Sequence, residues 1–345
     1  TVPSTMIFDD HDVRDDWNIS ESWVREIRAT DWWEARINGA FMSYWIYQHL
    51  GNLAPPELEQ EALLQAVFQA DDGGPALRRF ARASDRDTTA SRFAYHRDFG
   101  RSRLIVIDSR AARVLEAGAR DMVDADEWQW IAEHARGSYD HLIIASTLPV
   151  FMLDAIHDLE AWNEAVCSGA WGRVAARIGE KLRRALDLEH WPAFQRSFRT
   201  MLELLHELAE GPDAPGTITF IGGDVHTAYI AEVTLGSEQR SRVFQVVCSP
   251  FRNPLRANQR RAIRLLQTGP ARAICRRLAR AAGVAPPDAS WRFVTPLTFD
   301  NSIAALELDE RRARVAIRRS APETSDGWPL EPLHEHDLTL TSTIE

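Results

Sequence analysis

The chain contains the stretch Phe220-Ile221-Gly222-Gly223-Asp224-Val225-His226, in which an apolar run stops abruptly in two glycines, a carboxylate and a histidine. A second run of strand type, Met6-Ile7-Phe8, stops in Asp9-Asp10-His11-Asp12. Strands of a buried sheet are nearly continuously apolar, and catalytic groups collect in the loops where such strands end. We therefore expect the two acidic ends to meet at one edge of a sheet, where carboxylates and imidazoles can ligate a metal ion.

The rest of the sequence alternates between short apolar runs and longer amphipathic patterns. Runs rich in Ile and Val predict further strands at Leu104–Asp108, His141–Ser146, Thr217–Gly223, Tyr229–Leu235, Val243–Cys248, Ser302–Leu308 and Arg314–Arg318. Three- and four-residue apolar spacing predicts helices within Ser20–Leu50, Glu57–Ala70 and Leu159–Glu210, the last interrupted near Gly169, Gly172 and Pro192. This order predicts a mixed, layered α/β fold with a β-hairpin near its end.

The domain organisation follows from the absence of a convincing linker. We expect one domain over residues 1–319 and a polar tail over residues 320–345 that is poorly ordered or lies on the surface. The chain opens Thr1-Val2-Pro3-Ser4, without an initiator Met or a charged-then-apolar leader, which predicts processing or a fragment and leaves the compartment unknown.

Composition narrows the functional classes. The net charge of -10 argues against a general nucleic-acid binder, and the three separated cysteines form neither a disulfide framework nor a zinc ribbon. A 45% hydrophobic fraction in 345 residues supports a sizeable core, which fits an enzyme whose acidic residues include metal ligands.

The acidic blocks resemble motifs of the alkaline phosphatase D (PhoD-like) metallophosphatases. The segment Met6–Trp17 is similar to that family's "DDHE" block, and Gly223-Asp224-Val225-His226 is similar to its "GDVH" block. Three further segments follow in the family's order, so the resemblance covers most of Ser4–Leu308: Leu104–Arg110, Ile144–Phe151 and Gln245–Leu255. The family belongs to the calcineurin-like metallophosphoesterase superfamily, so the resemblance implies a two-sheet β-sandwich flanked by helices.

The resemblance also implies roles for individual residues. Asp10, Asp16, Asp224 and His226 fall on metal-binding positions, and His11 falls on the position of a catalytic histidine that contacts the phosphate or protonates the leaving group. The resemblance favours iron with calcium, while carboxylate and imidazole donors also suit Mn, Mg or Zn.

The family's earlier acidic block, of the form "GDQxYAD", has no counterpart in this sequence. This departure predicts the C-terminal portion of the family domain and leaves two functional readings open. The first is metal-dependent hydrolysis of small phosphomonoesters or phosphodiesters. The second is a truncated or degenerate scaffold with at most weak metal or phosphate binding. A metal-dependent carboxylesterase is an alternative within enzymes.

Of the 40 cationic residues 39 are arginine, so a single arginine carries little information about function. Arg14 and Arg252 are candidate phosphate-binding residues, with a surface role equally expected. Residues 255–283 contain eight arginines and no acidic residue, which allows contact with an anionic membrane surface but favours a solvated face of a packed helix. The oligomeric state is not predicted.

Overall fold

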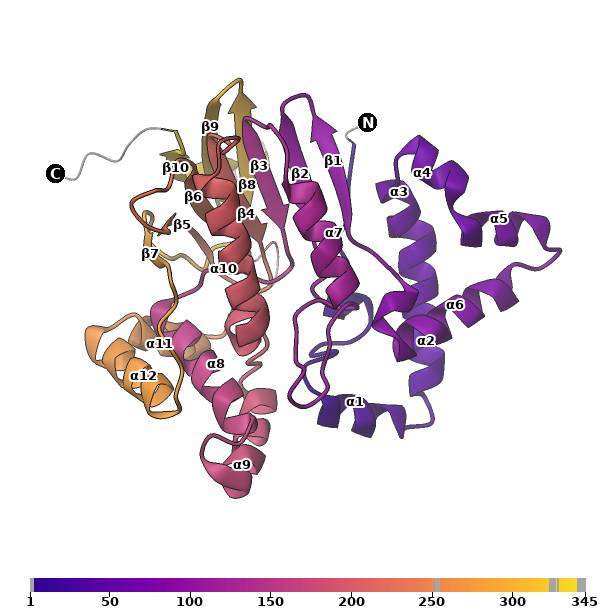
Figure 1. Ribbon diagram of the computed structural model, residues 1–345, viewed down its shortest axis with the longest axis horizontal. Coiled ribbons are helices and arrows are strands. Elements are labelled where there is room, and N and C mark those ends of the chain that lie inside the picture. The colour runs from indigo at the N-terminus through magenta and orange to yellow at the C-terminus, as the bar shows by residue number, and fades with distance from the viewer. Residues whose placement is uncertain (1–2, 250, 252–254, 323–326, 328, 340–345) are drawn as a thin grey trace.

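The computed structural model describes residues 3–249, 251, 255–322, 327 and 329–339. A seven-stranded mixed sheet forms its centre, in the order β1-β2-β3-β4-β6-β5-β7 (Figure 1). The strands are β1 Tyr95–Phe99, β2 Ser102–Val106, β3 His141–Ala145, β4 Thr217–Gly222, β5 Ala228–Thr234, β6 Arg242–Cys248 and β7 Ser290–Phe293. The predicted mixed α/β class is confirmed, whereas β1 and β7 were not predicted because their sequences are largely polar.

The four central strands, β2, β3, β4 and β6, run parallel to one another. Their registers are closely aligned: His141 of β3 lies opposite Ser102 of β2 and Thr217 of β4, and Thr217 lies opposite Arg242 of β6. The carboxyl ends of these strands therefore reach the same edge of the sheet. All five residues of β3 are buried, as expected for an inner parallel strand covered on both faces.

A second, antiparallel sheet contains β8 Ser302–Asp309, β9 Arg312–Ser320 and β10 Leu330–Asp337 in the order β10-β9-β8. The predicted hairpin is β8–β9. The expectation of a loosely ordered tail is wrong for residues 330–337, which pair with β9, and Leu338 after them is fully buried. A strand with one solvated face needs few apolar residues, so the polar sequence of β10 gave no apolar run from which to predict a strand.

Helices of the first third lie beside the β1 edge of the sheet (Figure 1). They are α1 Glu21–Arg28, α2 Trp33–Tyr44, the π-helix η2 Trp45–His49, α3 Leu50–Asn52, α4 Pro55–Gln60, α5 Ala62–Gln69 and α6 Gly74–Arg86. The helix predicted over Glu57–Ala70 is divided at Glu61, whose backbone is extended and whose side chain caps α5. Pro55 and Pro56 begin α4, because proline is well suited to the first turn of a helix.

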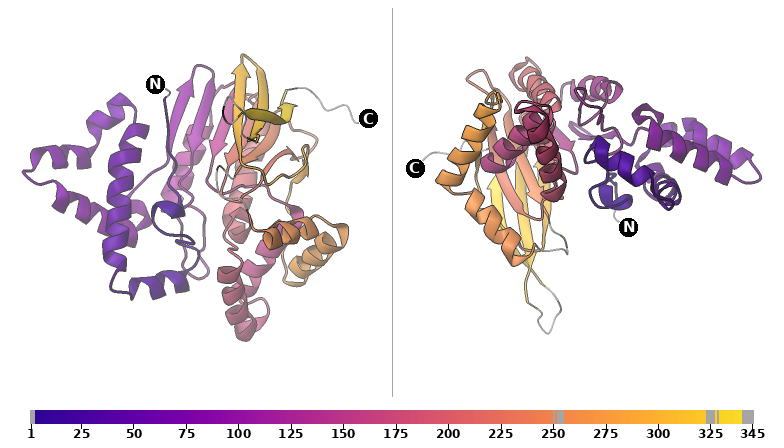
Figure 2. Two further views of the ribbon diagram at one scale, coloured as in Figure 1. Left: turned by 180° about the vertical axis from the view of Figure 1, so that it is seen from behind. Right: turned by 90° about the horizontal axis from the view of Figure 1, so that it is seen from below.

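The remaining helices are α7 Ala125–Ala135, α8 Asp154–Cys167, α9 Gly172–Ala185, α10 Gln195–Glu210, α11 Ala257–Leu266 and α12 Gly269–Ala281, with short 3₁₀ turns at η1 Asp10–Asp12, η3 Thr88–Ala90 and η4 Trp191–Ala193. Both α7 and α10 cover one face of the large sheet, and the second sheet lies on the other face (Figure 2). The breaks predicted near Gly169, Gly172 and Pro192 separate α8, α9 and α10. Within the described ranges, no helix has the length and apolarity needed to cross a bilayer.

One predicted strand, Met6–Phe8, is absent: these residues form an extended strap without a sheet partner. The Asn52 side chain accepts a hydrogen bond from the Met6 N–H and donates one to the Met6 carbonyl, both at 2.8 Å. Phe8 is buried among the rings of Trp17, Phe41, Tyr44 and Phe93. The apolar run is therefore explained by an aromatic core between helices, which a three-residue pattern cannot distinguish from a strand.

Candidate metal centre

The loop after β4 carries the first half of the site. Asp224 and His226 have φ of 65° and 50°, in the left-handed region that non-glycine residues rarely occupy and that is frequent at functional sites. The Gly223 N–H donates to the Thr147 carbonyl at 3.0 Å, which ties this loop to the one after β3. Gly222 passes so close to that neighbouring loop that an added Cβ would lie 3.2 Å from the Ser146 carbonyl oxygen.

The second half of the site is η1, which follows the Met6–Phe8 strap. Asp10 is almost completely buried, and its carboxylate accepts a hydrogen bond from the Asp16 N–H at 2.9 Å. The other Asp10 oxygen lies 2.9 Å from Nδ1 of His11, whose imidazole is largely exposed. The short turn is also held by the Asp9 N–H, which donates to the Asp12 carboxylate at 3.0 Å.

The two halves meet at the carboxyl edge of the parallel strands. One potential ligand atom from each of Asp9, Asp10, His11 and Asp224 can be chosen so that all lie within 4.8 Å of one another. The structure thus brings together Asp10, His11 and Asp224, as expected from the two acidic blocks. Asp9 joins them; its position in the same acidic block was the signal available for it.

A buried arginine joins these carboxylates. Arg110, in the loop after β2, is fully buried and donates from Nε to Asp9 at 3.0 Å and from Nη1 to Glu189 at 2.7 Å. Its Nη2 lies 3.4 Å from Asp10 and 3.3 Å from Asp224. One guanidinium therefore faces four carboxylates from three separate parts of the chain and fixes their relative positions.

Glu189 and His190, before η4, were not predicted as site residues. The Glu189 carboxylate accepts from Arg110 and Arg113, each at 2.7 Å, and lies almost fully buried. His190 Nδ1 lies 2.6 Å from Glu160, and Asp224 is among the charges that raise the pKa of His190 against the effect of burial. The sequence signal was weak: a Glu-His pair between helices more often serves packing.

The other predicted site residues occupy different positions. Asp16 lies outside the four-residue group; burial, together with the charges of Asp187 and Asp15, raises its pKa to about 7. Arg14 places its guanidinium carbon 5.4 Å from the centroid of the Trp32 ring. Among the described residues, the compact group does not include His226. Arg252 lies outside the described residues, and the roles assigned to all these side chains stay predictions.

The electrostatics of this site are determined by burial and by several close charges. Burial raises the pKa of Asp10 to about 6 despite Arg110, with Asp9, Asp224 and Glu189 adding to the increase. Hydrogen bonding to Asp9 raises the pKa of His11 to about 10, against burial and with support from Asp10, so His11 is protonated at neutral pH. Four carboxylates then face two arginines and one imidazolium, which leaves a negative charge uncompensated. A protonated His11 has no free nitrogen lone pair to donate, so the oxygen atoms of Asp9, Asp10 and Asp224 are the donors that this group offers to a hard cation.

Comparison with known proteins identifies the fold. The solved structure of PhoD superposes on the chain with a TM-score of 0.54, covering 97% of this chain and 54% of the PhoD chain at 12% sequence identity. The chain thus spans about half the length of that protein. No family profile matches the sequence, and no curated protein matches it. The likeness shows a PhoD-like fold, with a mixed seven-stranded sheet, a second sheet and flanking helices.

Proposed function

We propose that this chain carries a metal-dependent hydrolytic site for small phosphate esters, either monoesters or diesters. The observation that carries the proposal is the convergence of Asp9, Asp10, His11 and Asp224 at the carboxyl edge of a parallel sheet in a PhoD-like fold. Ligands in such folds bind in the crevice outside the carboxyl ends of the strands.

In this proposal Asp10 and Asp224 hold the cation, with Asp9 beside them. Asp16 and His226 are proposed to complete its surroundings from the adjacent turns. A bound cation would neutralise phosphate charge and lower the pKa of a water molecule towards neutrality. The resemblance to the PhoD-like family favours iron with calcium, and Mn, Mg or Zn also fit a site of carboxylates and imidazoles.

His11 has a different role, because its imidazole is exposed and its pKa of about 10 keeps it protonated. An imidazolium at the rim can donate a hydrogen bond to a phosphate oxygen and a proton to the departing alkoxide. Arg14 and Arg252 are proposed as further phosphate contacts.

The second candidate function is a scaffold that binds metal or phosphate weakly and turns nothing over. It is favoured by Arg110, whose guanidinium already supplies a positive charge among the four carboxylates. A cation must then bind beside a fixed positive charge, which lowers its affinity.

The experiment compares the chain with Asp224→Ala and, as a matched control, Asp213→Ala, whose carboxyl is exposed. Metal content is measured after loading with Fe, Ca, Mn, Mg or Zn, and hydrolysis is measured with p-nitrophenyl phosphate, bis-p-nitrophenyl phosphate and p-nitrophenyl acetate. We expect phosphate-ester turnover and bound metal, both lost in Asp224→Ala and retained in Asp213→Ala. Bound metal without turnover supports the scaffold, and turnover of the acetate alone indicates a carboxylesterase. Activity unaffected by Asp224→Ala contradicts the proposed site.

A further inference from the structure

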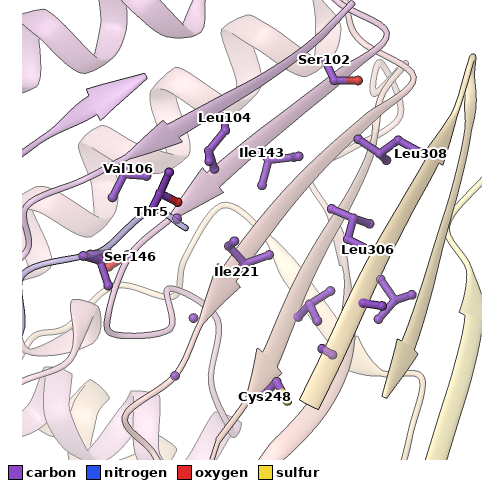
Figure 3. Close-up of a pocket in the computed structure, with 18 of the residues that line it drawn as sticks. Thr5, Ser102, Leu104, Val106, Ile143, Ser146, Ile221, Cys248, Leu306 and Leu308 are labelled. Carbon is purple, nitrogen blue, oxygen red and sulfur yellow. The ribbon is translucent and has the colours of Figure 1, made fainter. Parts of the chain in front are cut away.

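A groove of about 1490 Å³ lies between the large sheet and the second sheet. Its middle is apolar: Figure 3 shows side chains from β2, β3 and β4 on one side and from β8 on the other, among them Leu104, Val106, Ile143, Ile221, Leu306 and Leu308. Its ends are charged. One end, near the start of β2, contains Arg101, Asp140 and Glu310. The other end contains Asp9 and Asp224, which also belong to the candidate metal centre.

The groove exists because the second sheet covers only part of the large one. Ile230 of β5 and Phe244 of β6 are fully buried against Val315 and Ile317 of β9. On β2, β3 and β4 the same face is covered less completely: Ile7 of the strap packs in one cluster with Val106 and Ala145, and Leu104 and Ile221 stay half-buried. A continuous apolar cleft of this size on a folded protein is typical of an interaction site.

The edge strand β8 provides a second and independent observation. Within the described part of the chain, β8 pairs with β9 alone. The Ser320 N–H donates to the Asn301 carbonyl at 3.2 Å, and hydrogen-bonded pairs alternate along an antiparallel ladder. Ile303, Ala305 and Glu307 therefore direct their backbone groups to β9. The backbone groups of Ser302, Ala304, Leu306 and Leu308 point instead to the groove, as an unpaired edge.

We propose that this groove is the docking site of an extended polypeptide segment from outside residues 1–345, which pairs with β8 as a fourth strand of the second sheet. Neighbouring strands lie about 4.8 Å apart and stacked sheets about 10 Å apart, so a strand beside β8 lies above β4 and β3. Alternate side chains of the segment then face Ile221 and Ile143, which requires an alternating apolar and polar sequence. Its two ends meet the charged ends of the groove.

A second copy of the chain fits this site less well. Antiparallel pairing of two β8 edges about a twofold axis would place both large sheets on the same side of the joined sheet. The β2–β4 part of each copy would then occupy the space required by the other. A single strand has no such bulk and fills the groove without displacing the sheet beneath it.

The test uses a fluorescein-labelled probe peptide, Lys-Thr-Val-Thr-Val-Thr-Val-Lys, and a control peptide in which the central Val is replaced by Pro. Fluorescence anisotropy is measured with the wild-type chain and with Ala304→Pro. Proline at position 304 removes an edge N–H while leaving the β9 ladder intact. We expect saturable binding of the probe, with at least a tenfold loss for Ala304→Pro and for the control peptide. Leu306→Asp should weaken binding of the probe to a similar extent. The matched control is Val174→Asp, at an exposed apolar residue of α9 that does not line the groove, and it should leave binding unchanged.

Hydrogen exchange tests the same pairing without a substitution, in case a variant fails to fold. Saturation with the probe should slow exchange at the amides of Ala304, Leu306 and Leu308 by at least tenfold, and leave those of Ile303 and Ala305 unchanged. Absence of probe binding, unchanged edge amides, or equal binding to a folded Ala304→Pro variant overturns the proposal. A dimer in sedimentation that Ala304→Pro dissociates assigns the groove to a second copy and also overturns it.

Discussion

Glu189→Gln provides a sharp test of the buried charge network beside the candidate metal centre. The substitution keeps the shape of the side chain and removes the charge that faces Arg110 and Arg113. Both arginines are buried and hold the Glu189 oxygens at 2.7 Å. Burial alone would raise the pKa of Glu189, but the two arginines outweigh it and lower that pKa to about 2, so the carboxylate is ionised at pH 7. Removing one partner of a buried ion pair leaves an uncompensated charge and destabilises a protein by about 3–5 kcal/mol.

Arg110 keeps Asp9, Asp10 and Asp224 nearby, so we place the expected loss for Glu189→Gln at the lower end, about 3 kcal/mol. The free energy of unfolding is measured by urea denaturation at pH 7 in EDTA. Glu207→Gln is the matched control: Glu207 pairs bidentately with Arg136 at 2.5 and 2.8 Å, but both side chains are about half exposed. The control should lose at most about 1 kcal/mol. A loss for Glu189→Gln no larger than that of the control refutes a desolvated network.

Three further predictions follow from other parts of the chain. Burial lowers the pKa of His157 from 6.5 to about 4 in the folded state. As the pH drops from 6.5 towards 4, the His157 imidazole is therefore protonated in the unfolded state before the folded state, and the free energy of unfolding falls. His157→Leu should reduce the difference in the free energy of unfolding between pH 7 and pH 4.5, measured by urea denaturation, by up to about 3 kcal/mol. The same difference in the variant and the wild type would contradict this prediction. Gly222→Ala should destabilise by about 1–3 kcal/mol because its Cβ meets the backbone of the neighbouring loop, whereas Gly223→Ala, with the nearest atom 3.9 Å away, should change stability by less than about 0.5 kcal/mol. Thermal denaturation of the pair checks this, and equal losses refute it. The chain should not sediment with phosphatidylserine vesicles in a salt-sensitive way, because arginines of α12 approach Asp154 and Asp158 of α8. Vesicle binding that is lost at high salt would instead support membrane contact through residues 255–283.

The sequence was most informative where apolar runs end in loops. Seven of the strand predictions correspond to strands β2 to β6, β8 and β9, with ends shifted by at most two residues. The meeting of Asp10 with Asp224 was predicted correctly from a premise that holds only in part. Asp224 follows the carboxyl end of β4, as expected, whereas the Met6–Phe8 segment before Asp10 is not a strand of either sheet. The strap reaches the same edge through its aromatic packing and the hydrogen bonds of Asn52 to Met6.

The residues that sequence reasoning missed are those placed by tertiary structure alone. Arg110 follows β2 and Glu189 follows α9, and 79 residues separate them. Nothing local marks a buried ion pair in a chain so rich in arginine, because a guanidinium on the surface has the same sequence signature. The polar strands β1, β7 and β10 were missed for a related reason: their neighbours in the sheet, rather than their own apolar residues, determine that they are strands.

Asp9 and Asp224 belong both to the candidate metal centre and to the wall of the inter-sheet groove, which links the two proposals physically. A strand seated in the groove would exclude water from one side of these carboxylates. Attraction between opposite charges strengthens as the local dielectric falls, so a cation there would be held more tightly. By linkage, a bound cation would strengthen docking of the strand by the same factor. The affinity of the isolated chain for metal therefore measures the site with its groove side open to solvent, and the proposed hydrolytic function and the docking of a strand can fail separately.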